Sequence, residues 1–290
     1  MNRMFAGVLA AAVAAFIGCR APECGCGCTC GGEEPRISVF AHFVRSIAAQ
    51  RKVSLAEAAD MLYGLGVRGF DIGPGDKDLP ELAKTKLKPI NFYVFPKMLA
   101  ADNGAADCRA CLDQAERYGV PRVMVVPSHF TEGGDKEAEF LKDLSGMRLF
   151  VAEAKKRGIT ITVEDFGGRM NPGSYAKYLK RFLNEIPDLK FALDSGNLYY
   201  ADRGEDILEM MAYARGRIGH VHLKDQTREC HQQYASLGLG GVPNETIVKT
   251  MNAAGYDGWY TLENPVKGVD VYTEAVRQVA VLKSWLRESK

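Results

Sequence analysis

Four ionisable residues stand where runs of apolar residues end. Glu164, Asp194, His222 and Glu263 each terminate or interrupt such a run. A carboxylate at such a place costs roughly several kcal/mol if it is desolvated and unpaired, so a counter-charge is expected. A divalent cation held by three carboxylates and one imidazole would supply it. Hard oxygen ligands with one nitrogen favour Mn²⁺, Mg²⁺ or Co²⁺ and leave Zn²⁺ possible, which predicts a site for one divalent metal ion.

Each of the four residues, taken singly, has a plainer explanation. A glutamate at a strand end is often a helix cap or the ion-pair partner of a Lys or Arg. A lone histidine on a strand is more often a packed core residue than a ligand. Four such residues at the ends of consecutive apolar runs are poorly explained by coincidence. The joint pattern favours a shared site, provided that the fold brings the runs together.

From Arg36 onward, short apolar runs alternate with helical patterns. The predicted strands cover residues 37–43, 67–72, 90–95, 122–127, 159–165, 189–194, 218–225 and 259–263. The predicted helices cover residues 55–65, 79–87, 108–118, 136–156, 174–184, 206–214, 244–254 and 273–288. This alternation implies an α/β fold with parallel strands joined by crossover helices, and eight units favour a closed (β/α)8 TIM barrel. The C-terminal ends of its strands would converge on one mouth, where the four residues would meet.

The first 35 residues take no part in this alternation. Residues 1–18 combine a short basic start with an apolar run, which is typical of a signal peptide. Cys19 follows this run as the lipid-bearing cysteine of a bacterial lipobox does, although Phe16 stands where Leu is usual, so that secretion with cleavage nearby stays open. Residues 19–35, rich in Gly and Cys, predict a tether before a single domain at 36–290. We therefore expect an exported, membrane-anchored lipoprotein that faces the periplasm or the outside.

The cysteines support this division of the chain. The alternating cysteines from Cys24 to Cys30 could bind a soft metal or pair as disulfides in an oxidising compartment. Their spacing differs from the paired Cys-x-x-Cys of structural zinc sites, and we interpret them as part of the tether. Cys108 and Cys111 have redox-motif spacing but lie in a helical pattern with no thioredoxin-like surroundings. This predicts two partly buried helical thiols.

Short segments around the four residues resemble the motifs of a known superfamily. These segments are 161–165 (Ile-Thr-Val-Glu-Asp), 193–197 (Leu-Asp-Ser-Gly-Asn), 219–225 (Gly-His-Val-His-Leu-Lys-Asp) and 262–264 (Leu-Glu-Asn). They resemble the sugar isomerase/epimerase superfamily with the xylose-isomerase-like barrel. Ketose 3-epimerases, hydroxypyruvate isomerases and inosose dehydratases belong to it, and AP endonucleases are more distant relatives. The similarity runs from about Ile37 to Trp285, and its motifs are more specific for the superfamily than for a substrate.

The resemblance implies roles for the residues at matching positions. Glu164, Asp194, His222 and Glu263 would coordinate the metal, and the two glutamates would also form the acid–base pair. Arg228 lies six residues beyond His222, where ketose epimerases place a substrate-binding arginine. Its planar fork could bind hydroxyl or carbonyl oxygens, and an arginine in a surface loop is the alternative.

Further residues are predicted around the substrate. Asn197 stands three residues after the metal-binding Asp, where family members commonly have His; it can hydrogen-bond but cannot shuttle a proton near neutral pH. His42, Lys97 and His129 lie near the ends of the first, third and fourth predicted strands and are further substrate-binding candidates. His220 is expected on the strand face opposite to His222, as a packed or supporting residue.

The four candidate ligands and the family resemblance together imply proton transfer on a small sugar. A metal chelated by adjacent carbonyl and hydroxyl oxygens acidifies the intervening C–H by stabilising an enediolate. Glu164 would remove the proton and Glu263 would return it, which gives epimerisation, or isomerisation when the proton returns to the neighbouring carbon. Loss of hydroxide would give a dehydratase or lyase at the same site. A non-catalytic carbohydrate-binding lipoprotein is the alternative from another class, favoured by Asn197 and opposed by the presence of both glutamates.

Charge and composition narrow the choice of partners. The formal net charge of +1 gives no sign of a polyanionic partner, so no nucleic acid is expected. AP endonuclease activity is also disfavoured, because those enzymes use several metals with extra histidines and this chain has five His. Residues 238–241 (Gly-Leu-Gly-Gly) are a candidate phosphate loop but equally a hinge, so free sugars are preferred to sugar phosphates. Membrane contact is expected only through the lipid anchor, and a homo-oligomer is left open.

Overall fold

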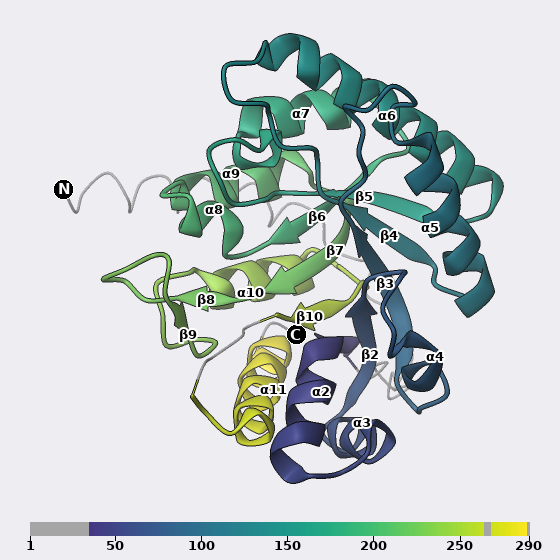
Figure 1. Cartoon of the computed structure of the whole chain (residues 1–290). Helices are drawn as coiled ribbons and strands as arrows, with labels where there is room; N and C mark the ends of the chain where they lie inside the picture. Colours follow the sequence, from purple (N-terminus) through teal and green to yellow (C-terminus); the bar gives the residue numbers. More distant parts are fainter. Residues whose placement is uncertain (1–34, 264–267, 289–290) are drawn as a thin grey trace, which may run out of the picture.

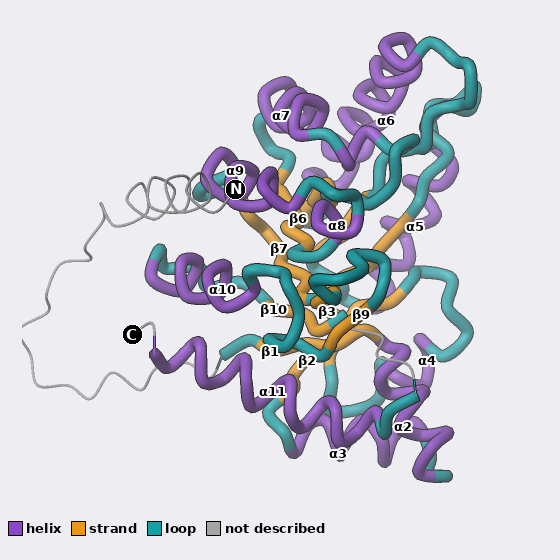
Figure 2. The backbone as a smooth tube through the Cα atoms, turned by 90° about the vertical axis from the view of Figure 1, so that its left-hand side faces the viewer, coloured by secondary structure: helices purple, strands orange, loops and turns teal. Residues whose placement is uncertain are grey.

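The computed structural model describes residues 35–263 and 268–288. Within this part of the chain, eight parallel strands close into a barrel in the order β1-β10-β7-β6-β5-β4-β3-β2, and helices surround the strands (Figures 1 and 2). The predicted (β/α)8 barrel is thus confirmed. The predictions for the signal peptide, for a lipid on Cys19 and for the cysteine-rich tether up to residue 34 lie outside the described residues. None of the described helices combines the length and the apolarity that crossing a membrane requires.

The strands of the barrel place the predicted ligands side by side. Their bounds are β1 (Ile37–Phe40), β2 (Val67–Ile72), β3 (Lys88–Val94), β4 (Arg122–Val125), β5 (Thr160–Glu164), β6 (Lys190–Asp194), β7 (Ile218–Leu223) and β10 (Tyr260–Leu262). The register pairs Asp194 of β6 with His222 of β7, and His222 with Thr261 of β10. Beyond β7, the short strands β8 (Asp225–Gln226) and β9 (Tyr234–Ala235) form an antiparallel hairpin.

Local signals in the sequence explain where the helices begin and end. The helices are α2 (Ala41–Arg51), α3 (Leu55–Gly64), α4 (Leu79–Leu82), α5 (Ala105–Tyr118), α6 (Lys136–Lys156), α7 (Ala176–Glu185), α8 (Asn197–Tyr200), α9 (Gly204–Tyr213), α10 (Asn244–Ala253) and α11 (Val271–Glu288), with a 3₁₀ turn at Pro172–Ser174. At the start of α3, Ser54 and Glu57 satisfy each other's backbone N–H groups in a capping box. At the end of α5, Gly119 adopts a φ of 65°, the left-handed conformation that returns the chain to β4.

The first predicted strand and the predicted helix at 79–87 are shorter in the structure than in the sequence prediction. The first strand ends at Phe40 rather than at residue 43, and α2 begins at Ala41, so that His42 lies in the first turn of a helix. The boundary is hidden in the sequence because apolar residues continue from the strand into the buried face of α2, which includes Phe43 and Val44. Helix α4 has four residues where a longer helix, 79–87, is predicted.

The two cysteines of the Cys-x-x-Cys pattern are buried on α5. Cys108 and Cys111 are free thiols, and burial raises the pKa of Cys108 to about 11 and that of Cys111 to about 12. A reactive or metal-binding cysteine needs its thiolate form, which these surroundings disfavour. The prediction of two buried helical thiols is confirmed.

Candidate metal centre

The four residues predicted as metal ligands lie together at the mouth of the barrel. Glu164 ends β5, Asp194 ends β6, His222 is the penultimate residue of β7, and Glu263 follows β10 directly. One ligand atom from each residue lies within 4.8 Å of the other three. Glu164, Asp194 and His222 are almost fully buried, and the side chain of Glu263 is 22% exposed. The fold therefore brings together residues that are far apart in the sequence, as predicted.

Nδ1 of His222 lies near more carboxylate oxygens than it can donate a hydrogen bond to. Its Nδ1 atom lies 3.1 Å from Oε1 of Glu164, 3.2 Å from Oε2 of Glu263 and 3.7 Å from Oδ2 of Asp194. One nitrogen carries at most one proton, so it cannot satisfy three carboxylate oxygens. Among the described residues, Oδ2 of Asp194 and Oε2 of Glu263 accept no hydrogen bond, although Nζ of Lys224 lies 3.0 Å from Oδ2 of Asp194 as an ion-pair partner. A divalent cation between these four atoms would satisfy them, and three carboxylate oxygens with one imidazole nitrogen are a donor set that suits such an ion.

The other nitrogen of His222 is held by a carboxylate that the sequence reasoning missed. Nε2 lies 3.1 Å from Oδ2 of Asp71, and this oxygen also lies 2.8 Å from Nε2 of His220. Asn91 donates to the same oxygen at 2.7 Å, and the hydroxyl of Thr261 donates to the second oxygen at 3.1 Å. A carboxylate that accepts from the far nitrogen of a histidine fixes the tautomer and the ring orientation, which leaves Nδ1 for a metal.

The placement of His220 corrects one prediction. His220 does not lie on the opposite face of β7, because residues i and i+2 of a strand share a face. Both rings point into the barrel, with their centroids 4.9 Å apart. The expected supporting role does fit the structure, since His220 contacts Asp71, the carboxylate that orients His222.

A lysine also belongs to the centre, and the sequence reasoning gave it no role. Lys224 is 5% exposed, and its Nζ lies 2.8 Å from Oε1 of Glu263 and 3.0 Å from Oδ2 of Asp194. The signal for it is its place directly after β7, two residues beyond His222, where the strand opens into the mouth.

The carboxylates of the centre have unlike electrostatic surroundings. Burial raises the pKa of Glu164 above its usual value, against the opposing effect of His222. Burial also raises the pKa of Asp194, to about 7, although Lys224 opposes it. For Glu263, burial is outweighed by Lys224 and His222, which hold its pKa well below the usual range. The two glutamates thus differ, with Glu164 the more easily protonated.

Asn197, the first residue of α8, hydrogen-bonds to the candidate ligand Asp194. Its backbone N–H and that of Gly196 donate to Oδ1 of Asp194, both at 2.8 Å. Its side-chain amide donates to the carbonyl oxygen of Asp165 at 2.8 Å. Asn197 therefore lies beside the candidate ligands as predicted, but its side-chain N–H group already donates to a backbone carbonyl just after β5. Its role as a substrate-binding residue stays a prediction.

Three of the other predicted substrate-binding residues lie around the mouth. The ring of His42 lies 5.8 Å from that of Phe40, which lies 4.9 Å from the ring of His222. Lys97 and His129 line a shallow pocket of about 310 Å³. The three residues follow the C-terminal ends of β1, β3 and β4, and their contact with a substrate stays a prediction.

Arg228 is placed differently from the other candidates. It is exposed on the loop of the β8–β9 hairpin, with its stem close to Gly241. Within the described part of the chain, no hydrogen bond or ion pair connects Arg228 with the four ligands. The structure therefore leaves it at the rim, and its contact with a substrate stays a prediction.

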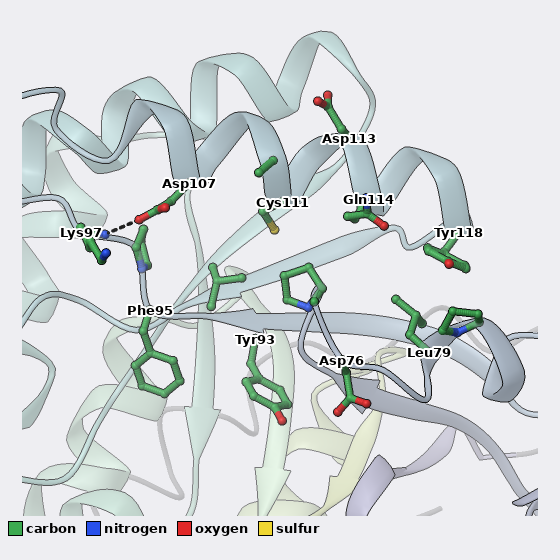
Figure 3. A pocket seen from close by; sticks show the side chains of 16 residues that line it. Asp76, Leu79, Tyr93, Phe95, Lys97, Asp107, Cys111, Asp113, Gln114 and Tyr118 are labelled. Atoms are coloured by element: carbon green, nitrogen blue, oxygen red, sulfur yellow. Dashed lines mark hydrogen bonds between the residues drawn. The ribbon is translucent and has the colours of Figure 1, made fainter.

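A second hollow lies apart from the ligands, between β3 and α5 (Figure 3). It has a volume of about 860 Å³, and Cys111, Gln114 and Tyr118 line it from one face of α5. At one end, the backbone N–H of Lys97 donates to Asp107 at 2.8 Å. None of the four ligands lines this cleft, which adjoins the single turn of α4.

The closed parallel barrel, with three carboxylates and one histidine converging at its C-terminal mouth, defines a TIM-barrel protein with a candidate metal centre. The chain belongs to the xylose isomerase-like TIM barrel family, whose model matches residues 63–288. The resemblance seen in the sequence is thus confirmed at the level of the family.

Individual relatives extend this comparison. The chain is 29% identical over 103 residues to an inosose dehydratase of Geobacillus thermodenitrificans strain NG80-2. These aligned residues cover 29% of this chain and 34% of that protein. It is 25% identical over 209 residues to a hydroxypyruvate isomerase-like protein of Streptomyces coelicolor, covering 64% and 72% of the two chains. A solved structure of the IOLI protein with a binding zinc atom has a TM-score of 0.70 at 13% identity, covering 88% of this chain and 99% of that one. The chain therefore spans about a third of the dehydratase it matches.

Proposed function

We propose that this protein is a metal-dependent isomerase or epimerase that moves a proton on a small carbohydrate. The observation that carries the proposal is the pair Glu164 and Glu263, both within 3.2 Å of Nδ1 of His222 at the barrel mouth. The family and the names of the two relatives support a sugar or a related small molecule as the substrate. A bound divalent metal would polarise the substrate's carbonyl oxygen and so make the neighbouring C–H more acidic.

The residues of the centre divide the remaining work. Glu164, Asp194, His222 and Glu263 would hold the metal, and Mn²⁺, Mg²⁺ or Co²⁺ suits this donor set, with Zn²⁺ also possible. The two glutamates would also exchange the proton with the substrate's carbon. Their pKa values are pushed in opposite directions, which is the pattern expected of a pair that divides the acid and base roles. Return of the proton to the same carbon gives epimerisation, and return to the next carbon gives isomerisation.

An unphosphorylated substrate is favoured by the loop that follows the β8–β9 hairpin. In phosphate-binding TIM barrels, the loops after the last strands bind the phosphate with backbone N–H groups. Here the buried carboxylate of Asp225 accepts the N–H groups of Gly238, Gly240 and Val242 at 2.9–3.1 Å, and the N–H of Gly241 donates to the carbonyl of Gln226 at 2.8 Å. The amides of the candidate phosphate loop are thus already bonded, which supports a free sugar or polyol-derived substrate.

Dehydration at the same centre is the second candidate. It is favoured by the match to an inosose dehydratase, and it needs the same proton removal followed by loss of hydroxide. A product lighter by one water distinguishes it from isomerisation. Export and a lipid on Cys19 also remain part of the proposal and are supported by the sequence of residues 1–19 alone.

Solvent-deuterium exchange tests the proposal. The full chain, Glu164→Gln and Glu263→Gln are incubated in D₂O with Mn²⁺ and a panel of ketoses, aldoses and inososes. We expect the parent to incorporate deuterium and each variant to lose about 10²–10⁴-fold of the rate, the usual contribution of general acid–base catalysis. Glu137→Gln, which alters an exposed glutamate paired with Arg181, is the matched control and should keep the parent rate.

Two outcomes would contradict the proposal in different ways. Exchange that is unchanged in both variants would remove the acid–base pair. Sugar binding by calorimetry without exchange or turnover over the whole panel would instead indicate the non-catalytic carbohydrate-binding protein.

A further inference from the structure

Lys224 contacts two carboxylates of the candidate metal centre, those of Asp194 and Glu263. Its Nζ lies 3.0 Å from Oδ2 of Asp194 and donates to Oε1 of Glu263 at 2.8 Å. No other Lys or Arg among the described residues forms an ion pair with the four ligands. The ammonium group therefore lies against two of the three carboxylates of the candidate centre.

On Asp194, the lysine contacts the oxygen that a metal would need. Oδ1 of Asp194 already accepts two backbone N–H groups, both at 2.8 Å. Only Oδ2 points toward Nδ1 of His222, at 3.7 Å. Because Lys224 lies against this same oxygen, a metal ion and the ammonium group compete for it.

On Glu263, by contrast, the lysine and a metal would share the carboxylate. Oε2 of Glu263 faces Nδ1 of His222 at 3.2 Å and has no hydrogen-bond partner among the described residues. Lys224 occupies only Oε1. A metal on Oε2 would therefore leave the bond between Lys224 and Glu263 in place.

We propose that Lys224 is a resident counter-cation, which occupies Oδ2 of Asp194 in the metal-free protein and yields it to the entering divalent ion while it remains on Glu263. This inference rests on the metal centre of the proposed function and not on the reaction. In the metal-free state, the ammonium group offsets the repulsion between buried carboxylates, which would otherwise be costly. In the metal-bound state, its positive charge opposes the ion. Metal affinity is thus set below what the four ligands alone would give.

Calorimetric titration of Mn²⁺ into the metal-free full chain, without sugar, tests the inference. We expect Lys224→Met to bind Mn²⁺ at least tenfold more tightly than the parent. The melting temperature of the metal-free variant should fall, and the gap to the parent should narrow when both proteins are saturated with Mn²⁺. Lys249→Met is the matched control: it removes the same charge from a helix surface, where Lys249 pairs with Glu245 and Glu288. Its Mn²⁺ affinity should stay within twofold of the parent.

A second variant and a direct measurement cover the case in which Lys224→Met does not fold. Lys224→Gln keeps an N–H donor without the charge and should also tighten Mn²⁺ binding. In a crystal structure of the Mn²⁺-loaded parent, Nζ should lie beyond about 3.5 Å, the limit of a direct polar contact, from Oδ2 of Asp194 and still bond to Glu263.

The outcomes separate this inference from the proposed function. Unchanged or weaker Mn²⁺ binding in the folded variants, or a loaded structure with Lys224 still on Asp194, would overturn the counter-cation role and leave the metal centre standing. A parent chain that binds no divalent metal would overturn both.

Discussion

Two clusters of polar side chains lie inside the barrel and differ in their balance of donors and acceptors. The upper cluster, at the mouth, consists of the four ligands and Lys224. The lower network lies deeper in the barrel, where His220 and Thr261 precede His222 and Glu263 by two residues. It consists of Ser38, Asp71, Asn91, His220 and Thr261. In the lower network, a single carboxylate receives bonds from an amide, a hydroxyl and two imidazoles. In the upper cluster, three carboxylates share one ammonium group and one imidazole nitrogen.

The difference indicates which cluster needs an added ion. Asp71, His220 and His222 also offer three ligand atoms within 4.8 Å of one another. Their carboxylate, however, is already bonded through both oxygens to groups of the protein itself. In the upper cluster, two carboxylate oxygens accept no hydrogen bond in the described part of the chain, and Lys224 contacts one of them as an ion pair. Burial and ligand type therefore do not suffice to recognise a metal site, and the count of donors against acceptors decides.

The largest effect is expected from Asp194→Asn in the upper cluster. The amide keeps an oxygen for the N–H groups of Gly196 and Asn197 but loses the charge that would bind the ion. We expect Mn²⁺ affinity to fall by more than about 100-fold, the upper end of the range for residues outside the coordination shell. At 100 times its dissociation constant, Mn²⁺ should stabilise the parent by about 2.7 kcal/mol, or roughly 5–10 °C in Tm, and this shift should vanish in the variant.

Calorimetry and thermal unfolding with and without Mn²⁺ measure this effect. Asp188→Asn, an exposed aspartate that pairs with Lys155, is the control and should keep the full thermal shift. A shift of the same size in Asp194→Asn would mean that the acceptor excess of the upper cluster does not mark a metal site.

A smaller effect on the metal is expected from Asp71→Asn in the lower network. Loss of the carboxylate that orients His222 should weaken Mn²⁺ binding by about 10–100-fold and lower the free energy of unfolding by about 1–3 kcal/mol. Thr261→Val is the control, because it removes a donor to the other oxygen of Asp71 and keeps the contact between Asp71 and Nε2 of His222. That variant should lose stability while Mn²⁺ affinity stays close to that of the parent. Equal metal affinities in Asp71→Asn and the parent would show that the two clusters act independently.

The last effect leaves metal binding unchanged and concerns Asp143, a buried carboxylate of α6 that belongs to neither cluster. Both of its oxygens accept the N–H of Ser128, at 3.0 and 3.3 Å, and burial raises its pKa to about 7. The folded protein therefore keeps a proton that the unfolded chain releases near pH 4. Stability from this group is complete below pH 4 and is lost as pH rises toward 7, at on the order of 1 kcal/mol per pH unit.

Urea unfolding from pH 4 to 8 in the presence of EDTA measures this contribution. Asp143→Asn should remove the share of the slope that Asp143 contributes, so that the variant gains stability relative to the parent as pH rises from 4 to 7. Parallel pH profiles of the two proteins would mean that Asp143 is charged in the folded protein. Burial would then not raise the pKa of this carboxylate as described.

Much of the fold is predictable from local patterns. Apolar runs, the capping box at Ser54 and helix-ending glycines such as Gly119 are short-range signals, and they give the order of strands and helices. The start of α2 is missed because its buried face continues the apolar run of β1. The hairpin β8–β9 is missed because its two-residue strands are too short to produce a periodic pattern.

The residues of the candidate site also divide into those that the sequence predicts and those that it does not. The four candidate ligands are predictable because each one ends or interrupts an apolar run at the same end of a parallel barrel. Asp71 is not, because its partner His220 lies 149 residues away and across the barrel interior, on a strand that is not a neighbour of β2. Lys224 is also missed, since its role depends on which oxygen of each carboxylate it contacts.

One bond at the seam of the barrel links assembly to the candidate centre. The hydroxyls of Ser38 and Thr261 lie 2.6 Å apart and join β1 to β10, the first and last strands, across 223 residues of chain. Thr261 also bonds to Asp71, which in turn holds His222. Biosynthesis must therefore reach the final strand before the cation pocket exists. A chain that ends before β10 would lack both Glu263 and the hydroxyl that bonds to Asp71, so the candidate centre can form only after the barrel has closed.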